Sequence, residues 1–287
     1  MDWVNRLNKA IGYIEENLTG DIKFEHAAQL ACCSLFHFHR MFAYIAGIPL
    51  SEYIRRRRMT AAAFDLQTTE EKIIDLALKY GYDSPTAFNR AFKSIHGISP
   101  SDARREGKKL VAYPRISFTI FVKGEEQMKY IIVTKEAFRI VGVKEHLDMN
   151  VEECFEKVPV FWQKTIQSGV VPNILSYMNK EPFGLLGVST CMNGKDLDYY
   201  IAVATDKPAP DHLEEYKIPE GTWAIFECVG PMPVAIQQLQ KRIVTEWLPT
   251  SGYEYANAPD IEVYFEGDQQ SPDYTCEVWL PIIKKES

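Results

Sequence analysis

A membrane-spanning helix needs a run of about 18 apolar residues, and the sequence contains no such run. Its first residues, Met1 to Arg6, lack the apolar core of a secretory signal, so we expect a cytoplasmic protein without a membrane partner. Cysteine is scarce, and the six cysteines include no pair with the Cys-x-x-Cys spacing of a zinc site. No Ser/His/Asp set or phosphate-binding loop stands out. We therefore expect no metal, no cofactor and no catalytic residue.

Charge is distributed unevenly along the 287 residues, a length that allows two ordinary domains. The net charge of −7 by itself argues against a nucleic-acid partner. Residues 1–110, however, hold 16 Lys and Arg against 13 Asp and Glu, whereas residues 111–287 hold 16 against 26. A basic front part and an acidic back part are expected when only one of two domains meets phosphate.

The first hundred residues contain an internal repeat with an offset of 50 residues. Between residues 27–51 and 77–101, nine of 25 aligned positions are identical, whereas average residue usage predicts roughly one or two. The identical pairs include Phe38 with Phe88, Arg40 with Arg90, and Gly47 with Gly97. Each copy is predicted to form a helix, a tight turn and a second helix. In the second copy Gly81 permits the turn, and Ser84 and Pro85 begin the second helix.

The second helix of each copy has two different faces. Apolar residues recur at i, i+3, i+4 and i+7 and are expected to face the core: Phe38, Met41, Phe42 and Ile45 in one copy, and Phe88, Ala91, Phe92 and Ile95 in the other. The opposite faces carry Phe36, His39 and Arg40 in the first copy, and Thr86, Asn89, Arg90 and Lys93 in the second. A solvated face would explain either helix alone. Arginine at the same outward position of both copies favours reading of base edges in the major groove.

A single helix of roughly 17 residues is predicted within residues 49–68, between the two copies. At 1.5 Å per residue it is about 25 Å long. Such a spacer could hold two recognition helices near one DNA turn apart, which is about 34 Å. This helix carries four consecutive arginines, Arg55 to Arg58, which point in different directions. Two interpretations fit: a solvated run, or phosphate contact by part of it, with Arg55 as the candidate.

Three stretches resemble a known family: Ser34–Phe42, Gly81–Lys93 and Gly97–Pro100. They are similar to the DNA-binding domain of the AraC/XylS family of transcription regulators, in particular its Rob-like branch, and the resemblance spans residues 5–107. It implies a double-stranded operator DNA as partner, read by Phe36, His39 and Arg40 from one helix and by Thr86, Asn89 and Arg90 from the other. Phe36 and Pro85 replace a Trp and a Gln of that branch, so the DNA sequence read is expected to differ.

The pattern changes after residue 107. Residues 108–127 are predicted to be a linker with a short apolar segment, and residues 128–287 a second domain. Strand-like and helix-like segments alternate there as β-α-β-β, twice: strands 130–134 and 138–143, helix 152–168, strands 183–191 and 198–204, then strands 215–217 and 222–228, helix 233–248, strands 261–265 and 274–282. The fold class is therefore multidomain, with an all-α double helix-turn-helix domain over residues 1–107 followed by an α+β domain.

Glu277 lies in an otherwise apolar strand-like segment. A carboxylate next to aromatic rings suits a flat cationic ligand, because it neutralises the charge while the rings stack on the ligand. The doubled layout and the segments 218–224 and 276–282 resemble the GyrI-like effector domain. The resemblance implies a pocket between the repeats with Glu277 as its acid and the following aromatic candidates: Trp223 and Tyr264 as walls, and Phe161, Trp162 and Trp279 in addition.

Ligand-tuned transcription is the leading hypothesis. A small amphipathic effector, cationic or aromatic, would bind the acidic domain and change either the DNA affinity or a contact with RNA polymerase. Three alternatives stay open. Glu277 is a surface residue on an edge, or it serves as general acid and base of a small hydrolase, which some GyrI-like domains resemble. In the third alternative the domain is a protein-interaction module with a closed core.

Overall fold

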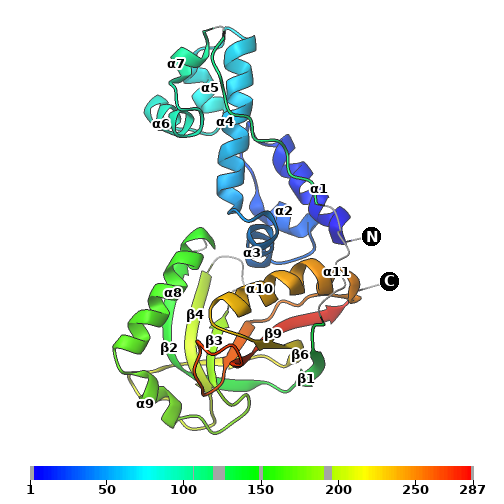
Figure 1. Cartoon of the computed structure of the whole chain (residues 1–287), viewed down its shortest axis with the longest axis vertical. Coiled ribbons are helices and arrows are strands. Elements are labelled where there is room, and N and C mark those ends of the chain that lie inside the picture. Colours follow the sequence, from blue (N-terminus) through cyan, green and yellow to red (C-terminus); the bar gives the residue numbers. More distant parts are fainter. Residues whose placement is uncertain (1–2, 106, 119–126, 149–150, 191–195, 286–287) are drawn as a thin grey trace. The chain divides into compact units, whose positions relative to one another are not determined.

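The chain changes from helices alone to a mixture of strands and helices between residues 103 and 130 (Figure 1). The computed structural model describes all residues except 1–2, 106, 119–126, 149–150, 191–195 and 286–287. This order of elements confirms the predicted multidomain fold class. The chain forms two compact units, the first from residues 1–31 and 46–119, and the second from residues 32–45 and 120–287. The second helix of the first repeat copy therefore belongs to the second unit.

Helices form the regular structure of the first unit, in this order: α1 Trp3–Glu16, α2 Phe24–Leu30, α4 Leu50–Thr68, α5 Ile73–Lys79, α6 Pro85–His96 and α7 Pro100–Ala103. The predicted spacer helix is α4, and α5 and α6 are the second repeat copy. Helix α6 begins as predicted, because Ser84 Oγ accepts a hydrogen bond from the Ala87 N–H at 3.2 Å and Pro85 follows it. Gly81 and Gly97, with φ of +76° and +75°, make the turns on either side.

A core of apolar side chains lies among α4, α5 and α6. Phe88 and Phe92 are fully buried in it, together with Met59 of α4 and Leu76 of α5. This burial confirms the apolar face that the spacing predicted for α6, since both phenylalanines follow the helical period.

The described part of the predicted linker, residues 108–118, is attached to the first unit. The Asn8 side chain and the Phe118 backbone exchange two hydrogen bonds, of 2.9 and 2.8 Å. The Ile116 N–H donates to the Tyr53 hydroxyl at 3.1 Å. Each of these bonds holds the segment against α1 or α4. Residues 108–118 are therefore part of the first unit and do not act as a flexible linker. The rest of the predicted linker up to residue 126 lies outside the described residues.

The second unit contains α3 and an antiparallel sheet with helices on it. Its elements are α3 Leu35–Ala46, β1 Tyr130–Lys135, β2 Phe138–Asp148, α8 Val151–Gln167, α9 Val171–Ser176, β3 Leu185–Ser189, β4 Asp196–Ala204, β5 Glu214–Ile218, β6 Gly221–Val229, α10 Val234–Arg242, a π-helix Ile243–Trp247, α11 Leu248–Thr250, β7 Tyr253–Tyr255, β8 Asp260–Tyr264 and β9 Thr275–Lys284. The predicted strands and the two predicted helices are found near their predicted bounds. The short elements α9 and β7 were not predicted.

The sheet is built from two interlocked repeats. Its strand order is β1-β6-β9-β8-β3-β4-β2-β5, and β7 pairs with β9. Strands β2, β3 and β4 belong to one repeat, and β6, β8 and β9 to the other, so the repeats meet where β3 pairs with β8. The edge strands are exchanged: β1 pairs with β6 of the second repeat, and β5 pairs with β2 of the first. Side chains on β8 therefore lie at the junction of the two repeats.

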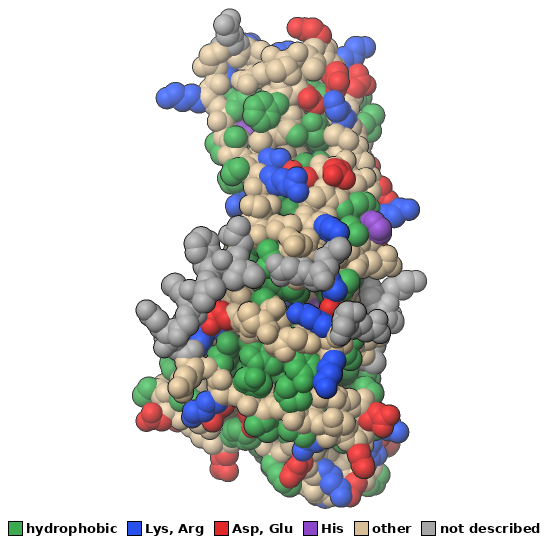
Figure 2. All heavy atoms as spheres, turned by 90° about the vertical axis from the view of Figure 1, so that its right-hand side faces the viewer, with side chains coloured by type: hydrophobic (Ala, Val, Ile, Leu, Met, Phe, Trp, Pro, Cys, Tyr) green, Lys and Arg blue, Asp and Glu red, His purple; other side chains and the backbone are tan. Residues whose placement is uncertain are grey.

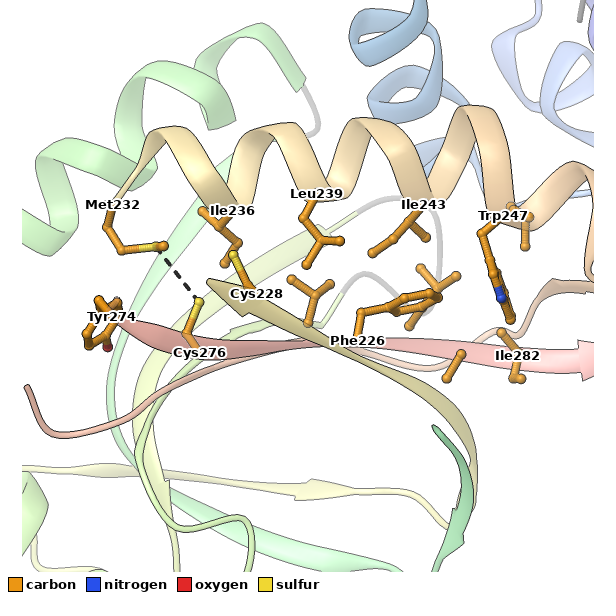
Figure 3. Close-up of a cluster of buried hydrophobic side chains, with 14 residues drawn as sticks. Phe226, Cys228, Met232, Ile236, Leu239, Ile243, Trp247, Tyr274, Cys276 and Ile282 are labelled. Atoms are coloured by element: carbon orange, nitrogen blue, oxygen red, sulfur yellow. Dashed lines mark hydrogen bonds between the residues drawn. The ribbon is translucent and has the colours of Figure 1, made fainter. Parts of the chain in front are cut away.

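Alternate side chains along the strands serve two different cores. On one face Phe226, Cys276 and Val278 belong to one buried cluster with residues of α10 and of the π-helix that continues it. Figure 3 shows Phe226 and Cys276 below these helices. On the other face Trp223 and Trp279 belong to a separate buried cluster. This division decides which predicted ligand residues can meet.

Candidate functional site

The outward face of α6 is exposed as the sequence predicted. It carries Thr86, Asn89, Arg90 and Lys93. Arg55 of α4 lies next to this helix, because its Nη1 donates a hydrogen bond of 2.8 Å to Ser94 Oγ. The Arg55 side chain remains 38 % exposed. Four polar side chains and one flanking cation are thus available on the side of α6 that faces away from the core.

The other arginines of the run have partners inside the first unit. Arg56 shares the carboxylate of Glu52 with Arg55, Arg57 forms an ion pair of 2.7 Å with Glu15, and Arg58 donates to the carbonyl oxygens of Leu18 and Gly20. The surface in Figure 2 likewise shows Lys and Arg side chains next to Asp and Glu side chains. The run mainly joins α4 to its neighbours, which leaves Arg55 as the candidate for a phosphate contact.

Helix α3 differs from α6, and here the prediction of an outward face is wrong. Phe36 is only 6 % exposed, because it packs with Leu147, Leu197, Tyr199 and Ile201 of the second unit. The Arg40 side chain points toward β8, and its guanidinium Nη1 donates to Asp260 Oδ2 at 2.8 Å. His39 is partly buried. The sequence pattern identifies the polar face of a helix, but it does not tell what covers that face.

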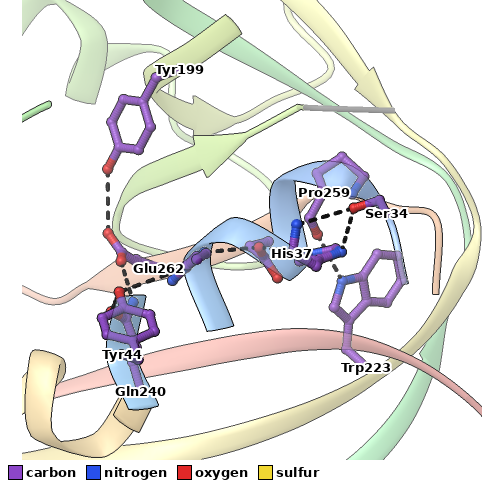
Figure 4. A network of polar contacts seen from close by, with 10 residues as sticks. Ser34, His37, Tyr44, Tyr199, Trp223, Gln240, Pro259 and Glu262 are labelled. Carbon is purple, nitrogen blue, oxygen red and sulfur yellow. Dashed lines mark hydrogen bonds and ion pairs between the residues drawn. The ribbon is translucent and has the colours of Figure 1, made fainter. Parts of the chain in front are cut away.

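A carboxylate surrounded by aromatic groups does lie at the junction of the repeats, and it is Glu262 of β8. The hydroxyls of Tyr264 and Tyr199 donate to Glu262 Oε2 at 3.0 and 3.3 Å. Trp162 of α8 donates from Nε1 to the Tyr199 hydroxyl at 2.9 Å, and its ring lies 5.1 Å from the Tyr264 ring, edge to face. Gln240 of α10 donates from Nε2 to Glu262 Oε1 at 2.6 Å. Figure 4 shows Tyr199 and Gln240 converging on Glu262.

The protonation of the two phenols follows from their surroundings. Burial, and after it the negative charge of Glu262, raises the pKa of Tyr199 and of Tyr264 well above the ordinary value. Both hydroxyls therefore remain donors to the carboxylate. Gly187 of β3 makes room for them, since a Cβ there would lie 2.3 Å from the Tyr199 hydroxyl and 3.0 Å from Glu262 Oε2. The site is a half-buried carboxylate with aromatic walls, which suits an organic cation.

The predicted ligand residues are divided between the two faces of the sheet. In the β8–β9 register Glu262 is opposite Val278, and Val263 is opposite Glu277, so the two glutamates point to different faces. Tyr264 and Trp162 lie on the Glu262 side, and the Phe161 ring is 6.4 Å from that of Tyr199.

The other three predicted residues lie on the opposite face. Trp279 donates to Glu277 at 2.7 Å, and Trp223 is fully buried next to Trp279. The prediction of one pocket that gathers all six residues around Glu277 is therefore wrong. Glu262, Tyr199 and Gln240 were missed, although Glu262 is also a charged residue inside an apolar strand.

Metal binding and membrane insertion find no support in the described part of the chain. No group of three or more His, Cys, Asp or Glu side chains is arranged there to hold a metal ion. No described helix is long and apolar enough to cross a membrane.

Comparison with known proteins adds the family. Residues 128–283, more than half of the chain, match the GyrI-like small molecule binding domain, and residues 27–106 match a helix-turn-helix domain. The HTH-type transcriptional activator AarP of Providencia stuartii is 45% identical over 95 residues, which are 33% of this chain and 70% of AarP. This chain is an AraC-type regulator with a GyrI-like domain. The resemblance inferred from the sequence is confirmed.

Two further relatives of this regulator cover more of it. The right origin-binding protein of Escherichia coli K12 is 25% identical over 301 residues, which cover 98% of this chain and 99% of that protein. A solved structure of SAV2435 bound to tetraphenylphosphonium has a TM-score of 0.50 and 26% identity, and covers 54% of this chain and 94% of that one. The regulator is thus a DNA-binding transcription regulator with a small-molecule binding domain, and the hydrolase alternative is not supported.

Proposed function

We propose that this regulator binds an organic cation at Glu262 and reads its operator with the polar faces of α6 and α3. The observation that carries the first part is the carboxylate of Glu262 inside a wall of aromatic groups, with donors at 2.6, 3.0 and 3.3 Å. A negative charge held by phenol donors beside indole and phenol rings favours a delocalised cation over a neutral molecule of the same shape. The cation in the SAV2435 structure supports this class of ligand.

The effector class is tested by titration calorimetry with two matched probes. Tetraphenylphosphonium carries a delocalised positive charge, and triphenylphosphine oxide offers similar rings without a net charge. We expect the cation to bind at least about tenfold more tightly, which corresponds to roughly 1.4 kcal/mol. Equal affinities would mean that the rings bind the ligand and that the carboxylate plays no part in recognition.

The assignment of α6 as a reading helix is supported by its exposed polar face and by the cation of Arg55 beside it. We expect Arg90→Ala to weaken specific DNA binding by about 1–3 kcal/mol and to relax the preference at one base pair, because a bidentate arginine contact to guanine is lost. Arg105→Ala is the matched control, since Arg105 is 74 % exposed and lies outside α6. Fluorescence anisotropy with an operator selected from a random-sequence pool measures both. Similar losses of DNA affinity for the two variants would mean that Arg90 contributes only its charge and does not recognise a base.

The proposed function also implies a cellular location and a contact with RNA polymerase. A regulator that binds promoter DNA acts in the cytoplasm and, when it activates, contacts RNA polymerase. The name of AarP as a transcriptional activator supports this. In vitro transcription with purified RNA polymerase, from a promoter that contains the selected operator, tests the polymerase contact. A transcript yield that the protein does not change would argue against it.

A further inference from the structure

Two residues of α3 converge on one buried carboxylate of β8. The Arg40 guanidinium donates to Asp260 Oδ2 at 2.8 Å, and His37 Nε2 lies 3.1 Å from the same oxygen. The Asp260 side chain is only 8 % exposed, and its other oxygen, Oδ1, has no hydrogen-bond partner among the described residues. Burial alone would raise the pKa of Asp260, but His37 and Arg40 more than offset this and hold the pKa below its ordinary value. The carboxylate is thus charged, and α3 supplies the neighbouring positive charge.

A second chain of hydrogen bonds runs from α3 to Glu262. The Tyr44 hydroxyl donates to Gln240 Oε1 at 2.5 Å, and Gln240 donates in turn to Glu262 Oε1 at 2.6 Å (Figure 4). Gln240 therefore contacts both α3 and Glu262, the carboxylate proposed to bind the effector. A ligand that displaces Gln240 from Glu262 would therefore also disturb the hydrogen bond between Gln240 and Tyr44.

The face of α3 that makes these contacts is the face proposed to read DNA. Phe36 and Arg40 were assigned to the major groove by the sequence, and in the structure Phe36 is buried and Arg40 is bound to Asp260. The Arg40 side chain is only 16 % exposed and Phe36 only 6 %, so the face of α3 that would enter the major groove is covered. Packing of α3 against β8 and reading of DNA by α3 are therefore mutually exclusive.

The space beside Glu262 is closed by the same helix. A cavity of about 20 Å³ lies there, and its walls include Arg40 and Tyr44 of α3 together with Gln240, Tyr255, Asp260 and Glu262. This volume holds about one water molecule, whereas sites for organic ligands have volumes of roughly 300–1,000 Å³. An organic cation therefore does not fit in this cavity while Arg40 and Tyr44 of α3 form part of its wall.

We propose that α3 is the resident occupant of the effector site, and that an organic cation displaces it and so frees α3 to read DNA. The inference rests on the proposed function, since it assigns the regulation of the same site. The guanidinium of Arg40 pairs with Asp260 and lies within the field of Glu262, so it competes with an organic cation for the same negative charge. By linkage, the cation raises the DNA affinity, and DNA raises the affinity for the cation by the same factor.

The test weakens the α3 contact without touching α6. Asp260→Asn keeps the shape and removes the charge that holds Arg40 and His37. Tyr44→Phe removes only one hydroxyl. Asp206→Asn is the matched control, because Asp206 is exposed and bonded to Asn179 and Lys180. DNA binding by each full-length variant is measured by anisotropy with a selected operator, with and without tetraphenylphosphonium, and thermal melting reports whether each variant folds.

Without any cation, we expect Asp260→Asn to bind DNA about tenfold more tightly than the wild type, and Tyr44→Phe about threefold, because a larger share of the protein is competent to bind. Asp206→Asn should match the wild type. Tetraphenylphosphonium should tighten DNA binding by the wild type and leave Asp260→Asn nearly unchanged.

The two proposals fail in different ways. If the cation does not bind, the proposed effector class is wrong, and the cation-free comparison still decides the role of α3. If folded Asp260→Asn and Tyr44→Phe both bind DNA no better than the wild type, the contacts of α3 with Asp260 and Gln240 do not limit DNA binding, and this inference is overturned even where the cation binds. A wild-type DNA affinity that falls on addition of the cation would overturn it as well.

Discussion

Phe226→Ala is expected to lower the free energy of unfolding of the second unit by about 3–5 kcal/mol. Phe226 is fully buried under the helix that covers this face of the sheet, near Trp247 (Figure 3). The Trp247 ring is 4.9 Å and the Tyr130 ring 5.6 Å from the Phe226 ring. Truncation leaves a cavity among groups that come from three separate elements, so they cannot collapse together to fill it. Chemical denaturation followed by circular dichroism measures the change.

Val229→Ala is the control for this prediction. Val229 lies on the same strand, but it is 52% exposed, so its truncation should change stability by no more than about 0.5 kcal/mol. If the two variants lost the same stability, the strand would contribute through its backbone pairing and the cluster around Phe226 would add little.

Glu262→Gln is expected to weaken the binding of tetraphenylphosphonium by about 2–5 kcal/mol, because a half-buried cation would lose its counter-charge. The substitution keeps the shape of the side chain and its ability to accept from Tyr264 and Tyr199. Triphenylphosphine oxide should therefore bind both proteins with nearly the same affinity. Calorimetric titration of each protein with each probe gives the four affinities.

The matched control is Glu277→Gln. Glu277 is the other glutamate in an apolar strand, and it points to the opposite face, where it accepts a hydrogen bond from Trp279. We expect this variant to bind the cation as the wild type does. A larger loss for Glu277→Gln than for Glu262→Gln would move the site to the face that carries Trp223 and Trp279.

The individual helices and strands could be predicted because each depends on residues that are close together in the sequence. The period of Phe88 and Phe92 and the cap at Ser84 both lie within one helix and its first turn, so the start of α6 and its buried face were predicted correctly. The strands were found in the same way. The strand order could not be found, because the pairing of β1 with β6 joins Tyr130 to Phe226 and no local pattern reports it.

The sequence predicted the type of site, a carboxylate among aromatic side chains, but it predicted the wrong glutamate. The reasoning that a charge inside an apolar strand has a purpose applies equally to Glu262 and Glu277, since both stand in alternating segments. Only the helices over the sheet distinguish them: α8 contributes Trp162 and α10 contributes Gln240 on the Glu262 face. The burial of Phe36 could not be predicted either, because the residues that cover it come from β2 and β4, more than a hundred positions later.

The exchange of β1 and β5 between the repeats has a consequence for how the second unit assembles. A half that ends after β4 would lack β5, the edge strand that pairs with β2, and a half that starts at β5 would lack β1, the edge strand that pairs with β6. Neither half has a complete sheet without a strand encoded in the other. Cutting the chain between β4 and β5 should therefore give two fragments that fold only by complementation. In the intact chain, contacts of such high sequence separation place the unit among slowly folding topologies.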